Sequence, residues 1–161
     1  MKKLMLLIFC TYFCVLCGCN DVSNVIPNTK NLAFTVESNF KNTDYIFYAT
    51  TDGDGTLSLT VKEPENIENL KLMFLDGSIR LNYLEIEKEI PIENFEGISL
   101  FKILYEGFKA EKSLEFDDDE YFSEFKVDNE KFRFYFAESG LPLCIKGENK
   151  KIFFKGVTVI K

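Results

Sequence analysis

The stretch Leu57–Tyr83, LSLTVKEPENIENLKLMFLDGSIRLNY, carries the clearest structural pattern in this chain. Apolar residues occupy every second position before the polar segment 63–69, and again on both sides of Asp76-Gly77. This alternation is typical of half-buried β-strands, and an Asp-Gly dipeptide between two alternating segments is typical of a β-hairpin. The stretch therefore predicts three short strands in succession.

The period of two extends over most of the chain after residue 31. Further extended segments are expected at residues 32–40, 45–50, 121–127, 132–136, 143–145 and 152–160, and the strand that begins near Ile79 is expected to continue through residues 84–92. The connections between them are too short for parallel crossovers, which need a dozen or more residues. We therefore expect about eight or nine antiparallel strands.

One segment follows a helical period instead. Apolar residues spaced three and four apart occur at Ile98, Phe101, Leu104, Tyr105 and Phe108. This spacing predicts one amphipathic helix over residues 94–110, with Asn94 as its N-cap. The predicted fold class is mainly β (α+β): a single curved antiparallel sheet or half-open barrel with this helix covering one face.

The N-terminus has the pattern of a bacterial export signal. Lys2 and Lys3 precede an uncharged apolar run of 14 residues, Leu4–Cys17, which is short for a membrane span of about 20 residues. The run ends in Leu16-Cys17-Gly18-Cys19, which resembles the lipobox of bacterial lipoproteins. The resemblance implies that the Cys19 thiol receives a diacylglycerol and becomes the new N-terminus. An ordinary signal peptide cut nearby and a retained signal anchor are the alternatives.

This interpretation divides the chain into a signal peptide at residues 1–18, a flexible tether at residues 19–31 and a β-rich domain at residues 32–161. It also accounts for the five cysteines, because only Cys144 remains within the domain and cannot form an intrachain disulfide. Since Cys144 lies in a strand-like run, we expect a buried structural thiol rather than a reactive one.

Composition excludes several kinds of chemistry. The 161 residues include no His, which removes Ser-His-Asp triads, imidazole metal ligands and imidazole proton transfer. The net charge is −7, and it becomes −9 once residues 1–18 and their two lysines are removed. Such an acidic chain would be repelled by nucleic acid and by anionic lipid headgroups. We therefore expect no nucleic-acid partner, and membrane association through the lipid anchor.

Two acidic segments could in principle hold a cation. Asp52-Gly53-Asp54-Gly55 is similar to the start of a calcium-binding loop with Glu63 at position twelve, but an alternating strand lies between them. A hairpin turn is therefore favoured there. The run Asp117–Glu120 could bind a divalent cation weakly, and a solvated acidic loop is favoured. No catalytic, metal or cofactor-binding residue is assigned.

Two segments carry a family resemblance: Leu57–Tyr83, with its Asp-Gly turn, and Phe132–Lys146, FRFYFAESGLPLCIK. Over residues 32–160 the chain resembles the lipoprotein-carrier superfamily, LolA/LolB-like, and particularly small bacterial lipoproteins with that fold. The resemblance implies a half-open, strongly curved sheet with a helical lid that holds acyl chains without catalysis. The chain departs from the carriers because it lacks a long amphipathic helix before its first strand. Its expected anchor is a feature of LolB-type receptors rather than of soluble carriers.

The leading hypothesis is a non-enzymatic lipoprotein of the cell envelope, anchored at Cys19 on the extracytoplasmic face of the cell membrane. It includes a lipid or other apolar ligand in the half-barrel. The alternative is a surface module that binds a protein partner and has a fully packed core, and an enzyme is the least favoured class. Fifteen Phe remain after the signal is removed, and they either fill the core or line a concave cavity, with the core favoured.

Overall fold

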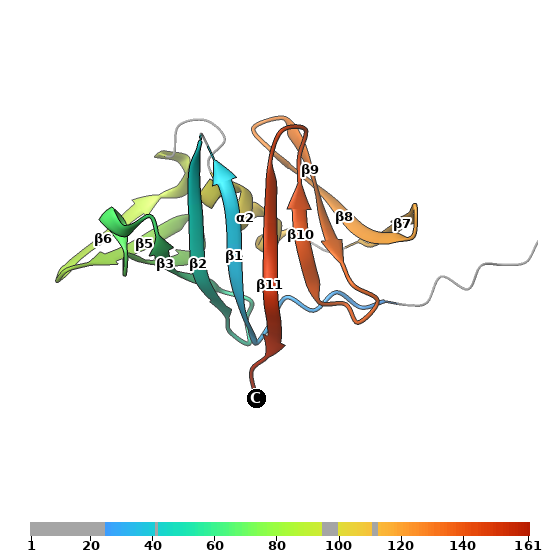
Figure 1. The fold of residues 1–161 in the computed structure, drawn as a ribbon, viewed down its shortest axis with the longest axis horizontal. Helices are drawn as coiled ribbons and strands as arrows, with labels where there is room; N and C mark the ends of the chain where they lie inside the picture. The colour runs from blue at the N-terminus through green and yellow to red at the C-terminus, as the bar shows by residue number, and fades with distance from the viewer. Residues whose placement is uncertain (1–24, 41, 95–99, 111–112) are drawn as a thin grey trace, which may run out of the picture.

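The computed structural model describes residues 25–40, 42–94, 100–110 and 113–161. These residues form one eleven-stranded sheet that curves around a helix (Figure 1). The strands are β1 (Leu32–Phe40), β2 (Thr43–Thr51), β3 (Leu57–Glu63), β4 (Lys71–Leu75), β5 (Ser78–Tyr83), β6 (Ile86–Pro91), β7 (Glu115–Asp117), β8 (Glu120–Val127), β9 (Glu130–Phe136), β10 (Pro142–Lys146) and β11 (Lys151–Val159). The helices are α2 (Leu100–Lys109) and the single 3₁₀ turns η1 (Glu65–Ile67) and η2 (Ile92–Asn94).

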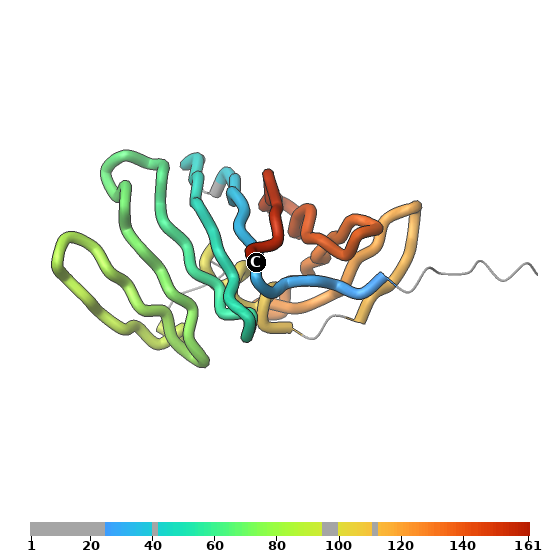
Figure 2. The backbone as a smooth tube through the Cα atoms, turned by 90° about the horizontal axis from the view of Figure 1, so that it is seen from below, coloured from blue at the N-terminus to red at the C-terminus, as the bar shows by residue number. Residues whose placement is uncertain are grey.

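The sheet consists of two meanders joined at their terminal strands. Its order is β6-β5-β4-β3-β2-β1-β11-β10-β9-β8-β7, and every neighbouring pair is antiparallel. The segment that contains α2 leads from one edge strand, β6, to the other, β7, and α2 lies inside the curve of the sheet (Figure 2). The predicted fold class is confirmed: one large curved antiparallel sheet, not closed into a barrel, with a single α-helix in the described part of the chain.

The predicted strand number was too low. The strand expected to continue from about residue 79 to residue 92 turns back at Leu84-Glu85, where φ is 51° and 66° and Tyr83 pairs with Ile86. The short strand β7 was also missed, and it pairs with β8 through a turn at residues 118–119 with φ values of 50° and 63°. Leu and Glu rarely adopt this left-handed conformation, so nothing in the sequence marks the first turn.

The helix is shorter than predicted. Asn94 ends η2 and does not cap α2, which begins at Leu100. The Ile92 amide donates to the Gly77 carbonyl, so this turn belongs to the end of the β5–β6 hairpin. Residues 95–99, including Ile98, lie outside the described residues. Of the predicted apolar face, Leu104, Tyr105 and Phe108 are buried and Phe101 is partly buried, while Leu100 and Ile103 are buried without having been predicted.

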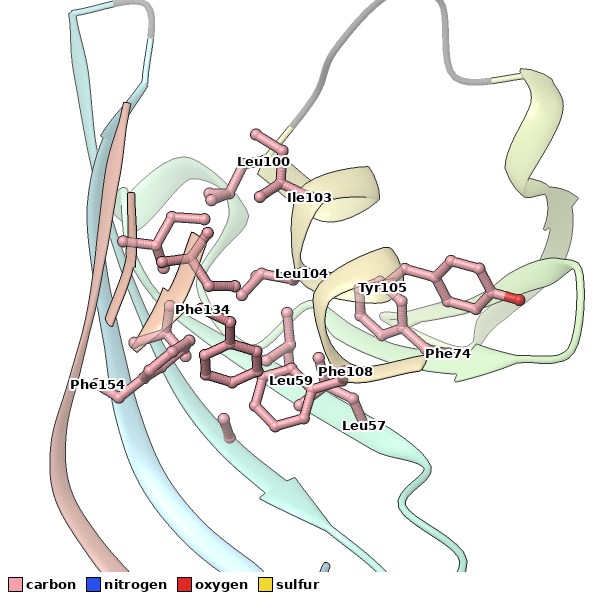
Figure 3. Close-up of a cluster of buried hydrophobic side chains, with 14 of the residues drawn as sticks. Leu57, Leu59, Phe74, Leu100, Ile103, Leu104, Tyr105, Phe108, Phe134 and Phe154 are labelled. Carbon is pink, nitrogen blue, oxygen red and sulfur yellow. The ribbon is translucent and has the colours of Figure 1, made fainter. Parts of the chain in front are cut away.

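Phenylalanine rings fill the space between α2 and the sheet (Figure 3). The centroid of Phe108 on the helix lies 5.7 Å from Phe34 on β1, 5.3 Å from Phe134 on β9 and 5.8 Å from Phe154 on β11. All four side chains are buried. We call these four residues the aromatic cluster. The sequence left open whether the phenylalanines fill the core or line a cavity. In this part of the sheet they fill the core.

Residues 25–31, which we call the strap, lie against the β-rich domain. The Asn28 amide donates to the Gly140 carbonyl at 2.8 Å and the Asn31 amide donates to the Asp52 carbonyl at 3.0 Å. Val25 packs against the core, and the Ile160 amide donates to the Asn31 carbonyl. The sequence assigned this segment to a flexible tether, but its backbone pairing makes it part of the folded body. The remainder of the tether, Cys19 and the signal segment lie outside the described residues.

The aromatic cluster gives a first prediction. Phe134→Ala removes a fully buried ring that contacts three others, so it should lower the free energy of unfolding by about 3–5 kcal/mol. Urea unfolding followed by circular dichroism measures this. Phe153→Ala, whose side chain is 46% exposed on β11, is the control and should cost well under half as much. Equal losses in the two variants would contradict the assigned core.

The strap gives a second prediction. Gly140 has φ +79°, and a Cβ there would lie 2.1 Å from the Ile26 carbonyl oxygen. Gly156 has a similar φ of +60° but open space around it. Gly140→Ala and Gly156→Ala should therefore share a conformational cost of about 1–2 kcal/mol, while only Gly140→Ala displaces the strap. Hydrogen exchange should show faster exchange of the Asn28 amide in Gly140→Ala alone, and unchanged protection would contradict the docking.

Candidate functional site

A cleft of about 410 Å³ lies where the strap, the β2–β3 turn, the β4–β5 turn and the C-terminal part of α2 meet. Its floor is apolar and consists of Leu57, Phe74, Tyr105 and Phe108. Its rim is charged and consists of Lys30, Asp54, Asp76 and Lys109. The volume falls in the range of roughly 300–1,000 Å³ that is usual for small-molecule sites.

The floor is continuous with the core of the domain. Leu57 begins β3, Phe74 lies on β4, and Tyr105 and Phe108 belong to the apolar face of α2. Phe74 and Tyr105 stack with their centroids 6.0 Å apart and an interplanar angle of 18° (Figure 3). Phe108 is shared with the aromatic cluster and separates the cleft from the rings behind it. The cleft is therefore an open depression in front of a packed interior.

A polar network fixes the helix end of the rim. Lys109 Nζ donates to Asp76 Oδ1 at 2.7 Å and to the Tyr105 hydroxyl at 3.0 Å, while the Gly77 amide donates to the same hydroxyl at 2.9 Å. The hydrogen bond to Asp76 raises the pKa of Lys109, and the same bond lowers the pKa of Asp76. Because the ion pair is exposed, its role is to position the end of α2 on the β4–β5 turn rather than to add much stability.

Lys30 provides a second cation at the rim. Its aliphatic stem lies beside Gly55, where an added Cβ would be 3.8 Å from Lys30 Cγ. Within the described part of the chain its ammonium makes no ion pair, unlike that of Lys109. The rim therefore presents one paired and one unpaired lysine above an apolar floor. An apolar ligand with a polar head would fit this arrangement, because its head could stay in water at the rim.

The acidic segments weighed in the sequence form turns. Asp52 Oδ1 accepts the amides of Thr56 at 2.8 Å and Asp54 at 2.9 Å, and the bond from Thr56 is the main reason for its lowered pKa. Glu63 ends β3, at the other end of the strand that follows this turn. The run Asp117–Glu120 forms the β7–β8 turn. No group of three or more His, Cys, Asp or Glu suited to a metal ion occurs among the described residues.

Cys144 is buried, as predicted, and burial raises the pKa of its thiol. It lies on the convex face of the sheet beside Phe122 and Tyr135. Arg133 covers the Phe122 ring at 4.4 Å and Lys146 covers the Tyr135 ring at 3.9 Å. Buried, shielded and with a raised pKa, this thiol has the properties of a structural residue rather than of a nucleophile.

A second cleft, of about 610 Å³, lies at the opposite end of β1 and β2, next to the β10–β11 turn. Only three of its thirteen lining residues are apolar, Tyr45, Ile46 and Phe153, against six of thirteen in the first cleft, so it suits an apolar ligand less well. The first cleft is therefore the candidate functional site.

None of the helices in the described ranges is long and apolar enough to cross a membrane.

Comparison with known proteins adds little to this assignment. No family model matches the chain, and no curated protein is significantly similar to it in sequence. One similar solved structure is a LolA superfamily protein from Nitrosomonas europaea, with 9% identity over 81% of this chain and 85% of that chain. It bears the superfamily name that the sequence resemblance gave. Its TM-score of 0.43 is too low to assign this chain to that family.

The sequence predicted Tyr105 and Phe108 on an apolar helix face and left open a concave cavity in the half-barrel, but it did not predict where the cleft lies or which segments line it. The cleft depends on the strap and on two turns that meet only in the folded chain, at Thr29-Lys30, Asp54–Leu57 and Phe74–Asp76. The Gly residues in the β2–β3 turn and the Asp-Gly dipeptide marked both turns, but nothing in the strap marked its docking. Local patterns therefore identified the parts of the site without their arrangement.

The Tyr105 hydroxyl gives a third prediction. Tyr105→Phe keeps the ring on Phe74 but removes the acceptor of the Gly77 amide, so it should cost about 1 kcal/mol of stability. Tyr48→Phe is the matched control, because the Tyr48 side chain on β2 is 49% exposed, and it should change stability little. Chemical denaturation of both variants tests this, and a loss in Tyr48→Phe as large as in Tyr105→Phe would argue against the network.

Proposed function

We propose that this protein is a non-enzymatic lipoprotein of the cell envelope that binds a lipid or other apolar ligand in the cleft. A lipid on Cys19 holds it to the extracytoplasmic face of the cell membrane. The single observation that supports the binding role is the apolar floor of Leu57, Phe74, Tyr105 and Phe108 beneath a charged rim. The lipobox-like Leu16-Cys17-Gly18-Cys19 supports the anchor.

The packing of the interior limits where a ligand can lie. The aromatic cluster occupies the space between α2 and the centre of the sheet, so an acyl chain would rest in the cleft in front of Phe108. Each methylene removed from water there contributes about 0.8 kcal/mol. A polar head would remain at the rim, within reach of Lys30 or Lys109. This arrangement suits one short or partly bound chain better than a fully enclosed lipid.

The binding role gives a fourth prediction. Residues 20–161 should enhance the emission of a dansyl-labelled fatty acid. Leu75→Asp places a charge in the wall of the cleft and should weaken this binding at least several-fold. Met73→Asp is the matched control, because Met73 lies two residues earlier on the same face of β4 and outside the cleft. Equal binding by both variants would place the ligand elsewhere.

The anchor gives a fifth prediction. In bacterial cells, Cys19→Ser should abolish acylation and leave the unprocessed precursor, because the acceptor thiol is missing. Cys17→Ser keeps the acceptor and a small residue before Gly18, so it should still be acylated and cleaved. Mass spectrometry of the N-terminal peptide distinguishes the two. Normal processing of Cys19→Ser would contradict the lipoprotein assignment.

A second candidate function is a module that binds another protein. The packed interior favours it, and so does the tip of the β5–β6 hairpin, where Leu84 and Ile86 are 74% and 69% exposed. Failure of the wild-type domain to take up the fatty acid, with its fold intact, would support this function over ligand binding.

A further inference from the structure

One end of the domain gathers the strap, the C-terminal end of β11 and the β2–β3 turn. Asn31 joins all three, because its amide donates to the Asp52 carbonyl and its carbonyl accepts the Ile160 amide. Val159 pairs with Leu32 at the start of β1. Figure 1 shows the strap and the C-terminus at the same end of the sheet. We call this region the strap end.

The strap end exposes aliphatic side chains that the core does not use. Ile26 is 80% exposed, Val159 is 55% exposed and Ile160 is 46% exposed. They come from the two ends of the described chain and lie on elements that are fixed by backbone hydrogen bonds. Ile26 lies beside Gly140 at one end of the strap, and Val159 and Ile160 lie near Asn31 at its other end. Exposed apolar residues distributed along one end of a domain are expected where that end contacts a partner or a membrane.

The position of the proposed anchor indicates that the strap end contacts a membrane rather than a protein partner. Five residues separate Cys19 from Val25, so a fully extended connection reaches only about 20 Å. Because the strap is hydrogen-bonded to Gly140 and Asp52, its residues do not lengthen the connection between Cys19 and the domain. We propose that the strap end rests on the surface of the lipid bilayer, with Ile26, Val159 and Ile160 in contact with it. This inference rests on the proposed lipidation of Cys19.

The charge distribution and the cleft agree with this orientation. The domain is acidic as a whole, so contact with a bilayer is opposed unless it is confined to a small region. The strap end also contains two cations, Lys30 in the strap and Lys161 directly after Ile160, although Asp52 and Asp54 lie nearby. Because Thr29 and Lys30 form one wall of the cleft, the same contact would hold the cleft beside the membrane, where a lipid could enter it.

Tryptophan fluorescence can test the orientation, because the chain contains no Trp. Residues 19–161 contain every described element, and Cys144→Ala leaves Cys19 as the only thiol. Cys19 is coupled to a maleimide phospholipid in vesicles of phosphatidylcholine and phosphatidylglycerol that contain spin-labelled quencher lipids. Ile26→Trp and Ile160→Trp report on the strap end. Asn149→Trp is the matched control, at an exposed position in the β10–β11 turn at the opposite end of β11.

Ile26→Trp and Ile160→Trp should be quenched several-fold more than Asn149→Trp, with emission shifted to shorter wavelength. Equal quenching at the two ends, stronger quenching at residue 149, or no quenching in chains shown by mass to carry the lipid would overturn the inference. Because the lipid is attached chemically, a failure of acylation in cells would not change these results. The orientation and the proposed lipidation are therefore tested separately.

Discussion

The fold depends on the contact between Phe108 and the three rings of the aromatic cluster that belong to the sheet. Those rings come from β1, β9 and β11, so one helical side chain contacts both meanders at the line where they join. An open sheet of this curvature exposes a wide apolar face, and one helix of ten residues has to cover its centre. Ring pairs of this kind contribute about 0.5–1.5 kcal/mol beyond their buried area. The position of α2, and with it the cleft, follows from this contact.

The pairing of the two terminal strands adds a second constraint. β1 and β11 are hydrogen-bonded along their length although most of the chain separates them. The strap extends this pairing of the two ends of the chain. The Asn31 carbonyl accepts a hydrogen bond from the Ile160 amide, and the Asn28 amide donates one to the Gly140 carbonyl. The two ends of the domain therefore meet at the centre of the sheet rather than at its edges. A truncation inside the strap would remove one wall of the cleft as well as these bonds.

Local chemistry explains which features the sequence predicted. Alternation predicted the antiparallel sheet, and Asp76-Gly77 marked a real hairpin turn. Asp128-Asn129 forms another two-residue turn, with both φ angles positive, because Asn and Asp tolerate the left-handed region. Leu84-Glu85 forms the same kind of turn without such residues, so the strand count was too low. The strap docks through main-chain groups that every residue type possesses, and its sequence therefore gave no signal. The sequence contained no signal for the cleft either, because the segments that form its walls are far apart in the sequence.

The convex face and the edges explain how an open sheet of this size avoids uncontrolled association. Phe122, Tyr135 and Cys144 form a small apolar cluster on the convex face, and the long side chains of Arg133 and Lys146 lie over its rings. At one edge, β6 carries Glu87, Lys88 and Glu89 and ends at Pro91, and at the other, β7 has only three residues, two of them acidic. Charges, proline and short length are the usual means by which edge strands resist pairing with other chains. Most of the strongly exposed aliphatic residues lie at two places, the β5–β6 hairpin tip and the strap end. Of these two, the strap end is the one that contributes to the wall of the cleft and that continues toward Cys19 in the sequence.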